Sequence, residues 1–180
     1  MHRLVAAVFA LAFGFTNIVS AEAPATTPQR AVLVTGASSG IGRKITERLA
    51  AHGYLVYAGA RKEADLAVQN AIKNVQAVRL DVTKPEEIDA AVQTVTSGGR
   101  GLYGLVNNAG IASGALLIET PPDEFDATMR VNVYGPYRMT KAFAPLIVAG
   151  KGRIINIGSI SGILTEPEVG AYQMSKHAIE

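Results

Sequence analysis

Apolar residues along the chain follow two patterns, short continuous runs and longer stretches with helical spacing. Residues 31–35 are mostly β-branched and end at a glycine, which predicts a buried strand. Residues 41–52 repeat apolar side chains at helical spacing and stop at Gly53, which predicts a helix. The same criteria predict strands at residues 54–60, 75–80, 102–106 and 153–157. They predict helices at residues 63–72, 85–95 and 121–149, the last kinked at Gly135 and Pro136, and another from Gly170 onward.

The helix predicted at residues 85–95 carries a start signal. Thr83 precedes it, and Glu86 stands three residues later. This spacing is typical of a capping box, in which the hydroxyl side chain caps the helix N-terminus.

The predicted strands are almost wholly apolar and alternate with the predicted helices. Strands of this composition are buried on both faces, which is typical of a parallel sheet between two layers of helices. We therefore predict the α/β class, with a doubly wound parallel sheet of the Rossmann type. That dinucleotide-binding sheet has six strands, and about five are predicted here. We expect the C-terminal part of the domain to be missing from this chain.

The N-terminus differs from the rest of the chain. Residues 1–3 carry positive charge, residues 4–15 are almost wholly apolar, and small residues follow up to Ala21. This order is typical of a secretory signal cleaved after Ala21, or of an uncleaved anchor if the apolar part extends further. The protein is then exported or membrane-anchored, and it is cytoplasmic if the gene start is assigned too early. The predicted divisions are a leader at residues 1–21, a linker at 22–30 and a domain at 31–180.

Composition excludes several function classes. The chain has 180 residues, 48% hydrophobic and 18% charged, with a formal net charge of +2. No basic stripe is present, so nucleic-acid binding has no support. There are no cysteines, which excludes disulfides, thiolate metal sites and cysteine nucleophiles. The three histidines lack metal-ligand spacing with carboxylates, and no metal is implied.

A glycine-rich loop joins the first predicted strand to the first predicted helix, which is the setting of a phosphate-binding turn. Gly36 permits a tight turn, Gly40 lets the backbone approach a pyrophosphate, and Gly42 lets the helix pack closely on the strand. Ser38 and Ser39 add hydroxyl groups, and the helix N-terminus offers N–H groups to an anion. The spacing is G-x-x-x-G-x-G rather than G-x-G-x-x-G, and the alternative interpretation is an ordinary tight turn.

The end of the second predicted strand indicates which dinucleotide is bound. An acidic residue for the ribose 2′-hydroxyl of NAD is usual there, and this stretch has none. Arg61 can instead meet the 2′-phosphate of NADP. This favours NADP(H), with NAD(H) as the second choice. The alternative is that Arg61 and Lys62 are solvated loop charges.

Tyr172 and Lys176 stand four residues apart near the end of the chain. On a helix this spacing places both side chains on one face. A neighbouring ammonium stabilises a phenolate, which lets a phenol exchange protons closer to neutral pH. With a dinucleotide loop upstream, the pair predicts hydride transfer between a carbonyl and an alcohol. The alternative is an exposed pair on an amphipathic helix.

Six motifs follow one another from residue 30 onward. They are TGASSGIG at 35–42, LDVT at 80–83, NNAG at 107–110, VN at 131–132, Ser159, and Y-x-x-x-K from Tyr172 to Lys176. In this order and at this spacing the chain resembles the short-chain dehydrogenases/reductases. The resemblance implies an oxidoreductase that moves a hydride between NAD(P)(H) and a carbonyl or secondary alcohol. It also implies a small-molecule substrate and, for the full-length form, a homodimer or homotetramer.

The resemblance assigns roles to cofactor-binding residues. Asp81 and Val82 resemble the residues that hold the adenine ring, and the backbone of Ala109 and Gly110 is expected beside the ribose. Asn107 resembles a residue that stabilises the sheet. The expected cofactor residues are Gly36, Ser38, Ser39, Gly40, Ile41, Gly42, Arg61, Asp81, Val82, Asn108, Ala109, Gly110, Val131, Tyr172 and Lys176.

The resemblance also implies four catalytic residues. Ser159, favoured over Ser161 by its spacing from Tyr172, donates a hydrogen bond to the substrate oxygen. Tyr172 is the general acid in reduction and the base in oxidation, and Lys176 assists it and binds the ribose. Asn132 holds a water against the lysine, the alternative being a helix-interior residue that bonds its own backbone.

Two rival functions stay open. One is a dinucleotide-binding module or catalytically incompetent fragment without turnover. The other is a structural role for an exported pseudo-enzyme, which the presence of all four catalytic residue types argues against. Membrane association through the N-terminal segment is expected if the leader is an anchor.

Overall fold

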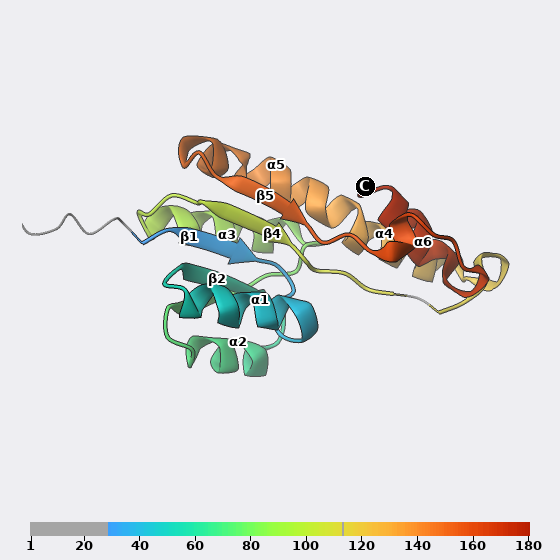
Figure 1. The fold of residues 1–180 in the computed structure, drawn as a ribbon, viewed down its shortest axis with the longest axis horizontal. Coiled ribbons are helices and arrows are strands. Elements are labelled where there is room, and N and C mark those ends of the chain that lie inside the picture. The colour runs from blue at the N-terminus through green and yellow to red at the C-terminus, as the bar shows by residue number, and fades with distance from the viewer. Residues whose placement is uncertain (1–28, 113) are drawn as a thin grey trace, which may run out of the picture.

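A computed structural model of the chain describes residues 29–112 and 114–180. The predicted leader and residues 22–28 of the predicted linker lie outside the described residues. One sheet of five parallel strands, in the order β3-β2-β1-β4-β5, forms the centre of the molecule (Figure 1). The strands are β1 (Ala31–Val34), β2 (Leu55–Ala60), β3 (Val75–Arg79), β4 (Gly104–Asn107) and β5 (Arg153–Asn156).

Helices alternate with these strands along the chain. They are α1 (Gly40–Ala51), α2 (Glu63–Asn70), α3 (Pro85–Ser97), α4 (Pro122–Asn132), α5 (Tyr134–Ala149) and α6 (Gly170–His177). Three short 3₁₀ helices, η1 (Leu117–Glu119), η2 (Ile160–Gly162) and η3 (Pro167–Val169), join the last elements. Across the described ranges, no helix combines the length and apolarity needed to cross a membrane.

Alternate residues of β1 enter two separate cores. Ala31 and Leu33 pack with Phe143 of α5 and Ile88 of α3 in one core. Val32 belongs to the other core, which lies under α1. A strand that is apolar at every position is the sequence signature of burial on both faces. The predicted α/β fold with a doubly wound parallel sheet is therefore confirmed.

Strand β5 departs from the prediction that every strand is covered on both faces. All four of its residues are exposed, including Ile155 at 52%. Among the described residues it is the last strand of the sheet and pairs with β4, and α5 packs against it. The apolar residues of β5 therefore do not indicate that the strand is buried on both faces.

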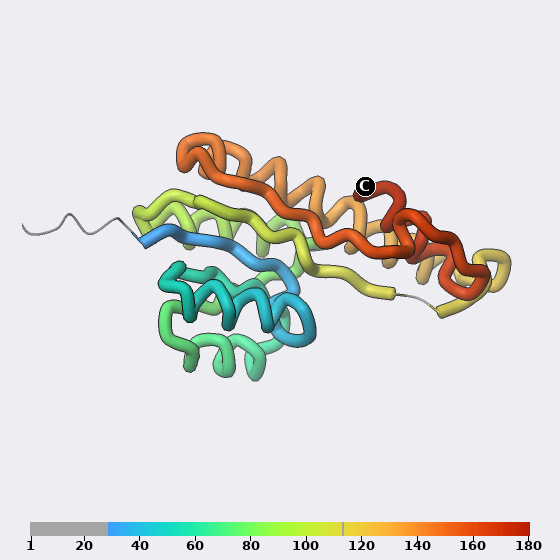
Figure 2. Tube along the Cα trace, viewed as in Figure 1, coloured from blue at the N-terminus to red at the C-terminus, as the bar shows by residue number. Residues whose placement is uncertain are grey.

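The strand order reverses between β1 and β4, because the chain first builds β2 and β3 on one side of β1 and then returns to the other. In parallel α/β sheets, ligands bind outside the carboxyl ends of the strands at this switch point. The carboxyl ends of β1, β4 and β5 point toward the end of the molecule where α4 and α6 gather (Figure 1). The segments after β4 and β5 both run to that end, and η1 contacts η3 there (Figure 2).

The predicted kinked helix at residues 121–149 is two helices, and the predicted place of the kink is wrong. Helix α4 ends at Asn132, and α5 begins at Tyr134 after Val133. A proline ring clashes with the carbonyl group four residues earlier in a continuous helix. For Pro136 that carbonyl belongs to Asn132, so the helix ends there rather than bending at Gly135.

The predicted cap at Thr83 is also wrong. Lys84 occupies the N-cap position of α3, and no side chain caps it. The Thr83 hydroxyl instead donates a hydrogen bond to Asp81 Oδ1 at 2.7 Å. The carboxylate of Glu87 accepts from the Asp81 backbone N–H at 2.7 Å. The polar groups before α3 therefore organise the end of β3 rather than the helix start.

Removal of the Phe143 ring tests the core between the sheet and α5. Phe143 is fully buried, and we expect Phe143→Ala to lower the free energy of unfolding by about 3–5 kcal/mol, since it removes buried contacts and leaves a cavity. Val148 on the same helix is 76% exposed, and Val148→Ala should change stability by no more than about 0.5 kcal/mol. Denaturant unfolding of both variants measures this, and equal losses would contradict the assigned core.

Candidate functional site

A cavity of about 450 Å³ lies at the carboxyl ends of β1, β2, β3 and β4. This volume is within the range of small-molecule sites, roughly 300–1,000 Å³. Every predicted cofactor residue except Tyr172 and Lys176 lines it. Four further lining residues were not predicted, Gly59, Ala60, Leu80 and Ile111. These four residues stand next to, or two positions from, predicted residues in the sequence. A prediction that included the end of each strand and the residues that follow it, and not only the motif residues, would have contained them.

Three glycines shape the loop after β1 and the first turn of α1. Gly36 has φ +63°, and a side chain on it would meet the Ala109 Cα at 2.8 Å. A side chain on Gly42 would collide with the Gly36 carbonyl oxygen and the Asn108 amide. Gly40 differs, because it has φ +52° and only open space where its side chain would stand. Gly36 and Gly42 thus permit close packing against the segment after β4, and Gly40 has open space beside its Cα.

Thr35 and Asn108 fasten this loop to the end of β4. The Thr35 hydroxyl donates to the Val106 carbonyl at 3.3 Å and accepts from the N–H groups of Asn108 and Ala109 at 3.0 and 2.9 Å. The Asn108 side-chain amide donates to the carbonyls of Thr35 and Gly36 at 2.9 and 3.1 Å. The sequence did not predict Thr35 as a site residue, although a hydroxyl at the end of an apolar strand was a signal.

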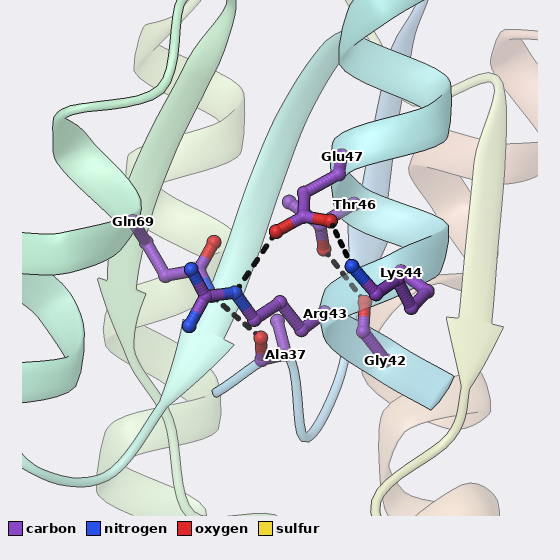
Figure 3. A network of polar contacts seen from close by, with 7 residues as sticks. All are labelled: Ala37, Gly42, Arg43, Lys44, Thr46, Glu47 and Gln69. Carbon is purple, nitrogen blue, oxygen red and sulfur yellow. Dashed lines mark hydrogen bonds and ion pairs between the residues drawn. The ribbon is translucent and has the colours of Figure 1, made fainter. Parts of the chain in front are cut away.

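Helix α2 bonds to the loop, and a further side-chain bond lies within the first turns of α1 (Figure 3). Gln69 Nε2 donates to the Ala37 carbonyl at 2.6 Å, and the Thr46 hydroxyl donates to the Gly42 carbonyl at 2.9 Å. Both side chains are fully buried. No local sequence signal pointed to Gln69, because its partner lies in a different element.

Arg61 lines the cavity at the end of β2. Arg79 donates to the Arg61 carbonyl at 2.7 Å and forms an ion pair with Glu63 at 2.6 Å. These contacts hold the turn between β2 and α2. None of the ion pairs in the described part of the chain involves the Arg61 guanidinium.

Asp81 lies at the same cavity, at the end of β3. Partial burial raises the pKa of its carboxyl, but hydrogen bonds from the Thr83 side chain and backbone and the positive charges of Arg61 and Lys84 more than offset this. The pKa of Asp81 is therefore lowered, and the carboxylate is the favoured form in the folded chain.

Tyr172 and Lys176 lie on α6 with their side chains together. The Lys176 ammonium stands 5.7 Å from the centroid of the Tyr172 ring. It also donates to the Ile157 carbonyl at 2.7 Å, just after β5, and is only 9% exposed. A buried ammonium needs such a partner. The bond ties α6 to the end of the sheet.

The side chain of Asn132 bonds to other elements and not to the backbone of its own helix. Its side chain accepts from the Ile111 N–H at 2.9 Å and donates to the Ile111 carbonyl at 2.8 Å, and also to the Ser175 hydroxyl at 2.9 Å. Ser175 in turn donates to the Tyr172 carbonyl at 2.6 Å. Asn132 thus links the strand extension after β4 to the turn of α6 that carries Tyr172. Ser175 was not predicted, although it stands between the two motif residues.

Ser159 is the N-cap residue of η2, and its hydroxyl oxygen accepts from the Ser161 N–H at 3.2 Å. Helix α6 packs against η2 and α4. Three of the four predicted catalytic residues, Asn132, Tyr172 and Lys176, lie on helices α4 and α6, and Ser159 directly precedes η2, which contacts α6.

The family model for the short chain dehydrogenase matches residues 30–180. The chain belongs to the short-chain dehydrogenase family. Mitochondrial D-beta-hydroxybutyrate dehydrogenase of Rattus norvegicus is 36% identical over 161 residues, which are 84% of this chain and 47% of that protein. This short-chain dehydrogenase chain spans about half the length of the curated relatives it matches.

Solved short-chain dehydrogenases share the fold. A gluconate 5-dehydrogenase from Burkholderia cenocepacia J2315, in complex with NADP and tartrate, has a TM-score of 0.78 and 30% identity over 83% of this chain and 61% of that one. A short chain dehydrogenase/reductase from Burkholderia phymatum, in complex with NAD, also has a TM-score of 0.78 and 30% identity, over 84% of this chain and 56% of that one. Of these two structural neighbours, one is thus bound to NADP and the other to NAD.

The lowered pKa of Asp81 sets a pH dependence. Its contribution to stability is complete above about pH 4 and is lost as the pH falls through its folded-state pKa. We expect Asp81→Asn to destabilise this short-chain dehydrogenase near pH 7 and to have a much smaller effect near pH 3. Denaturant unfolding of both proteins across this range measures the difference, and a difference independent of pH would contradict the assigned interactions.

Proposed function

We propose that the cavity binds NADP(H) or NAD(H), and that Ser159, Tyr172, Lys176 and Asn132 form the site at which a carbonyl is reduced or a secondary alcohol oxidised. The observation that carries this proposal is the cavity at the switch point of the sheet, lined by the glycine loop and the ends of the neighbouring strands. Membership of the short-chain dehydrogenase family supports oxidoreductase chemistry.

The loop geometry fits a pyrophosphate. Gly40 keeps open space outside the loop, so an anion can approach the backbone there. Helix α1 begins at this residue, and its first turn contains no acidic side chain. The N–H groups and the dipole at a helix N-terminus favour a negative group in this place.

The chemistry divides among four side chains. A nicotinamide dinucleotide, when bound, supplies or accepts the hydride. Ser159 keeps its hydroxyl proton for a substrate oxygen, because in its bond with Ser161 it acts as the acceptor. Tyr172 moves a proton between its phenol and that oxygen, and the Lys176 ammonium lies beside its ring. Asn132 acts on Tyr172 through Ser175, as a positioning residue.

NADP(H) is the favoured dinucleotide. The end of β2 offers Arg61 to the cavity, and its guanidinium suits a 2′-phosphate. The nearest acidic residue that follows, Glu63, is paired with Arg79. Glu63, the acid that could otherwise bind the 2′-hydroxyl of NAD, is thus paired with Arg79.

The proposed substrate is a small molecule with a carbonyl or secondary alcohol. D-beta-hydroxybutyrate, named by the relative from Rattus norvegicus, is the first compound to assay. Export or anchoring through residues 1–21 and assembly into a homodimer or homotetramer belong to the same proposal as expectations from the sequence.

Replacement of Tyr172 separates binding from chemistry. We expect Tyr172→Phe to lower turnover of the full-length protein by at least about a hundredfold, since it removes the proton donor, while the Kd for NADPH changes little. Steady-state kinetics and fluorescence titration measure the two quantities. Retained turnover would contradict the role of Tyr172. Dinucleotide binding without turnover in the unaltered protein would instead favour a binding module.

Arg61 tests the choice of dinucleotide. We expect Arg61→Ala to raise the Kd for NADPH about tenfold or more, because a charge-assisted contact with the 2′-phosphate is lost, and to leave the Kd for NADH unchanged. Lys62→Ala is the matched control, since Lys62 does not line the cavity. Equal effects of Arg61→Ala on both dinucleotides would contradict the preference for NADP(H).

A further inference from the structure

We propose that Gln69 is a positioning residue for the glycine loop, through its hydrogen bond to the Ala37 carbonyl. This inference rests on the proposed function, since the loop matters only if it holds a dinucleotide. Gln69 lies on α2 and does not line the cavity. Its effect on a ligand would therefore pass through the loop.

The bond is short and buried. Gln69 Nε2 stands 2.6 Å from the Ala37 oxygen, and Gln69 is 1% exposed (Figure 3). Ala37 is fully buried, and its N–H donates to the Gly59 carbonyl at 2.8 Å. Both backbone polar groups of Ala37 are thus bonded to other elements, one to β2 and the other to α2. This residue directly follows Gly36 and precedes the part of the loop that faces the cavity.

Gln69 satisfies a polar group of the loop and leaves one of its own atoms unsatisfied. Its second polar atom, Oε1, is buried and has no hydrogen-bond partner among the described residues. Its Nε2 supplies a donor to the carbonyl of Ala37, which is itself fully buried and needs such a partner. The free energy of this bond is therefore placed on the loop, and the pattern of hydrogen exchange distinguishes a local effect on the loop from a loss of stability throughout the sheet.

The bond also restricts where the loop can move. Gly36 and Gly40 adopt left-handed backbone conformations that leave a loop many alternatives when unrestrained. Thr35 and Asn108 hold the start of the loop, and helix α1 begins at its end. Gln69 and the Gly59 carbonyl both hold Ala37, the position after Gly36. Loss of the Gln69 donor removes one of these two restraints and leaves this segment of the loop less restricted.

Two variants test the proposal. Gln69→Met keeps the length of the side chain without the donor, and Gln69→Asn keeps the amide but shortens its reach. Gln93→Met is the matched control, because Gln93 is exposed on α3. For each protein, amide hydrogen exchange of residues 36–42 is measured without nucleotide. Kd values are then measured for NADPH and for adenosine 2′-monophosphate, which has no pyrophosphate.

We expect exchange in residues 36–42 of both Gln69 variants to be about tenfold faster, with strand exchange unchanged. We expect the Kd for NADPH to rise about tenfold and that for adenosine 2′-monophosphate by no more than about twofold. If Gln69→Met does not fold, Gln69→Asn carries the test.

Loop exchange and NADPH affinity equal to those of Gln93→Met would overturn the proposal. So would faster exchange throughout the sheet, which indicates a stability residue. If the unaltered chain binds neither NADPH nor NADH, the proposed function fails. Faster loop exchange in the variants would then still show that Gln69 positions the loop.

Discussion

The hydrogen bonds between Thr35 and Asn108 are the constraint on which the site depends. They join the ends of β1 and β4, which lie side by side in the sheet but far apart in sequence. Gly36 follows directly and has room for no side chain against Ala109. The end of β4 therefore sets the direction of the loop. The pairing of β1 with β4 places the loop and the segment after β4 on the same cavity.

The strand extension after β4 connects the two halves of the site. Asn108 fastens the glycine loop, and Ile111, three residues later, both lines the cavity and bonds to Asn132. Asn132 then reaches Ser175 on α6. A shift of this extension would move the lining of the cavity and the turn of α6 that carries Tyr172 together, which fixes the distance between them.

The sequence predicted the parts of this arrangement that depend on local pattern. Apolar runs identified the strands, and the glycine spacing identified the loop that lines the cavity. It did not predict contacts between distant elements, such as Gln69 to Ala37 or Asn132 to Ile111, because neither partner has an unusual local context. The helix break lies at Val133 and not at the predicted Gly135, because the ring of Pro136 clashes with the carbonyl four residues earlier. The exposure of β5 escaped prediction because composition alone does not show a strand's place in the sheet.

The central claim is that this cavity holds a nicotinamide dinucleotide. Titration of isotope-labelled chain with NADPH, followed by amide chemical shifts in nuclear magnetic resonance spectra, tests it most directly. The account predicts saturable shifts that are largest at residues 36–42, 59–61, 80–82 and 108–111, which line the cavity. Absence of saturable shifts, or shifts centred on another surface, would contradict it.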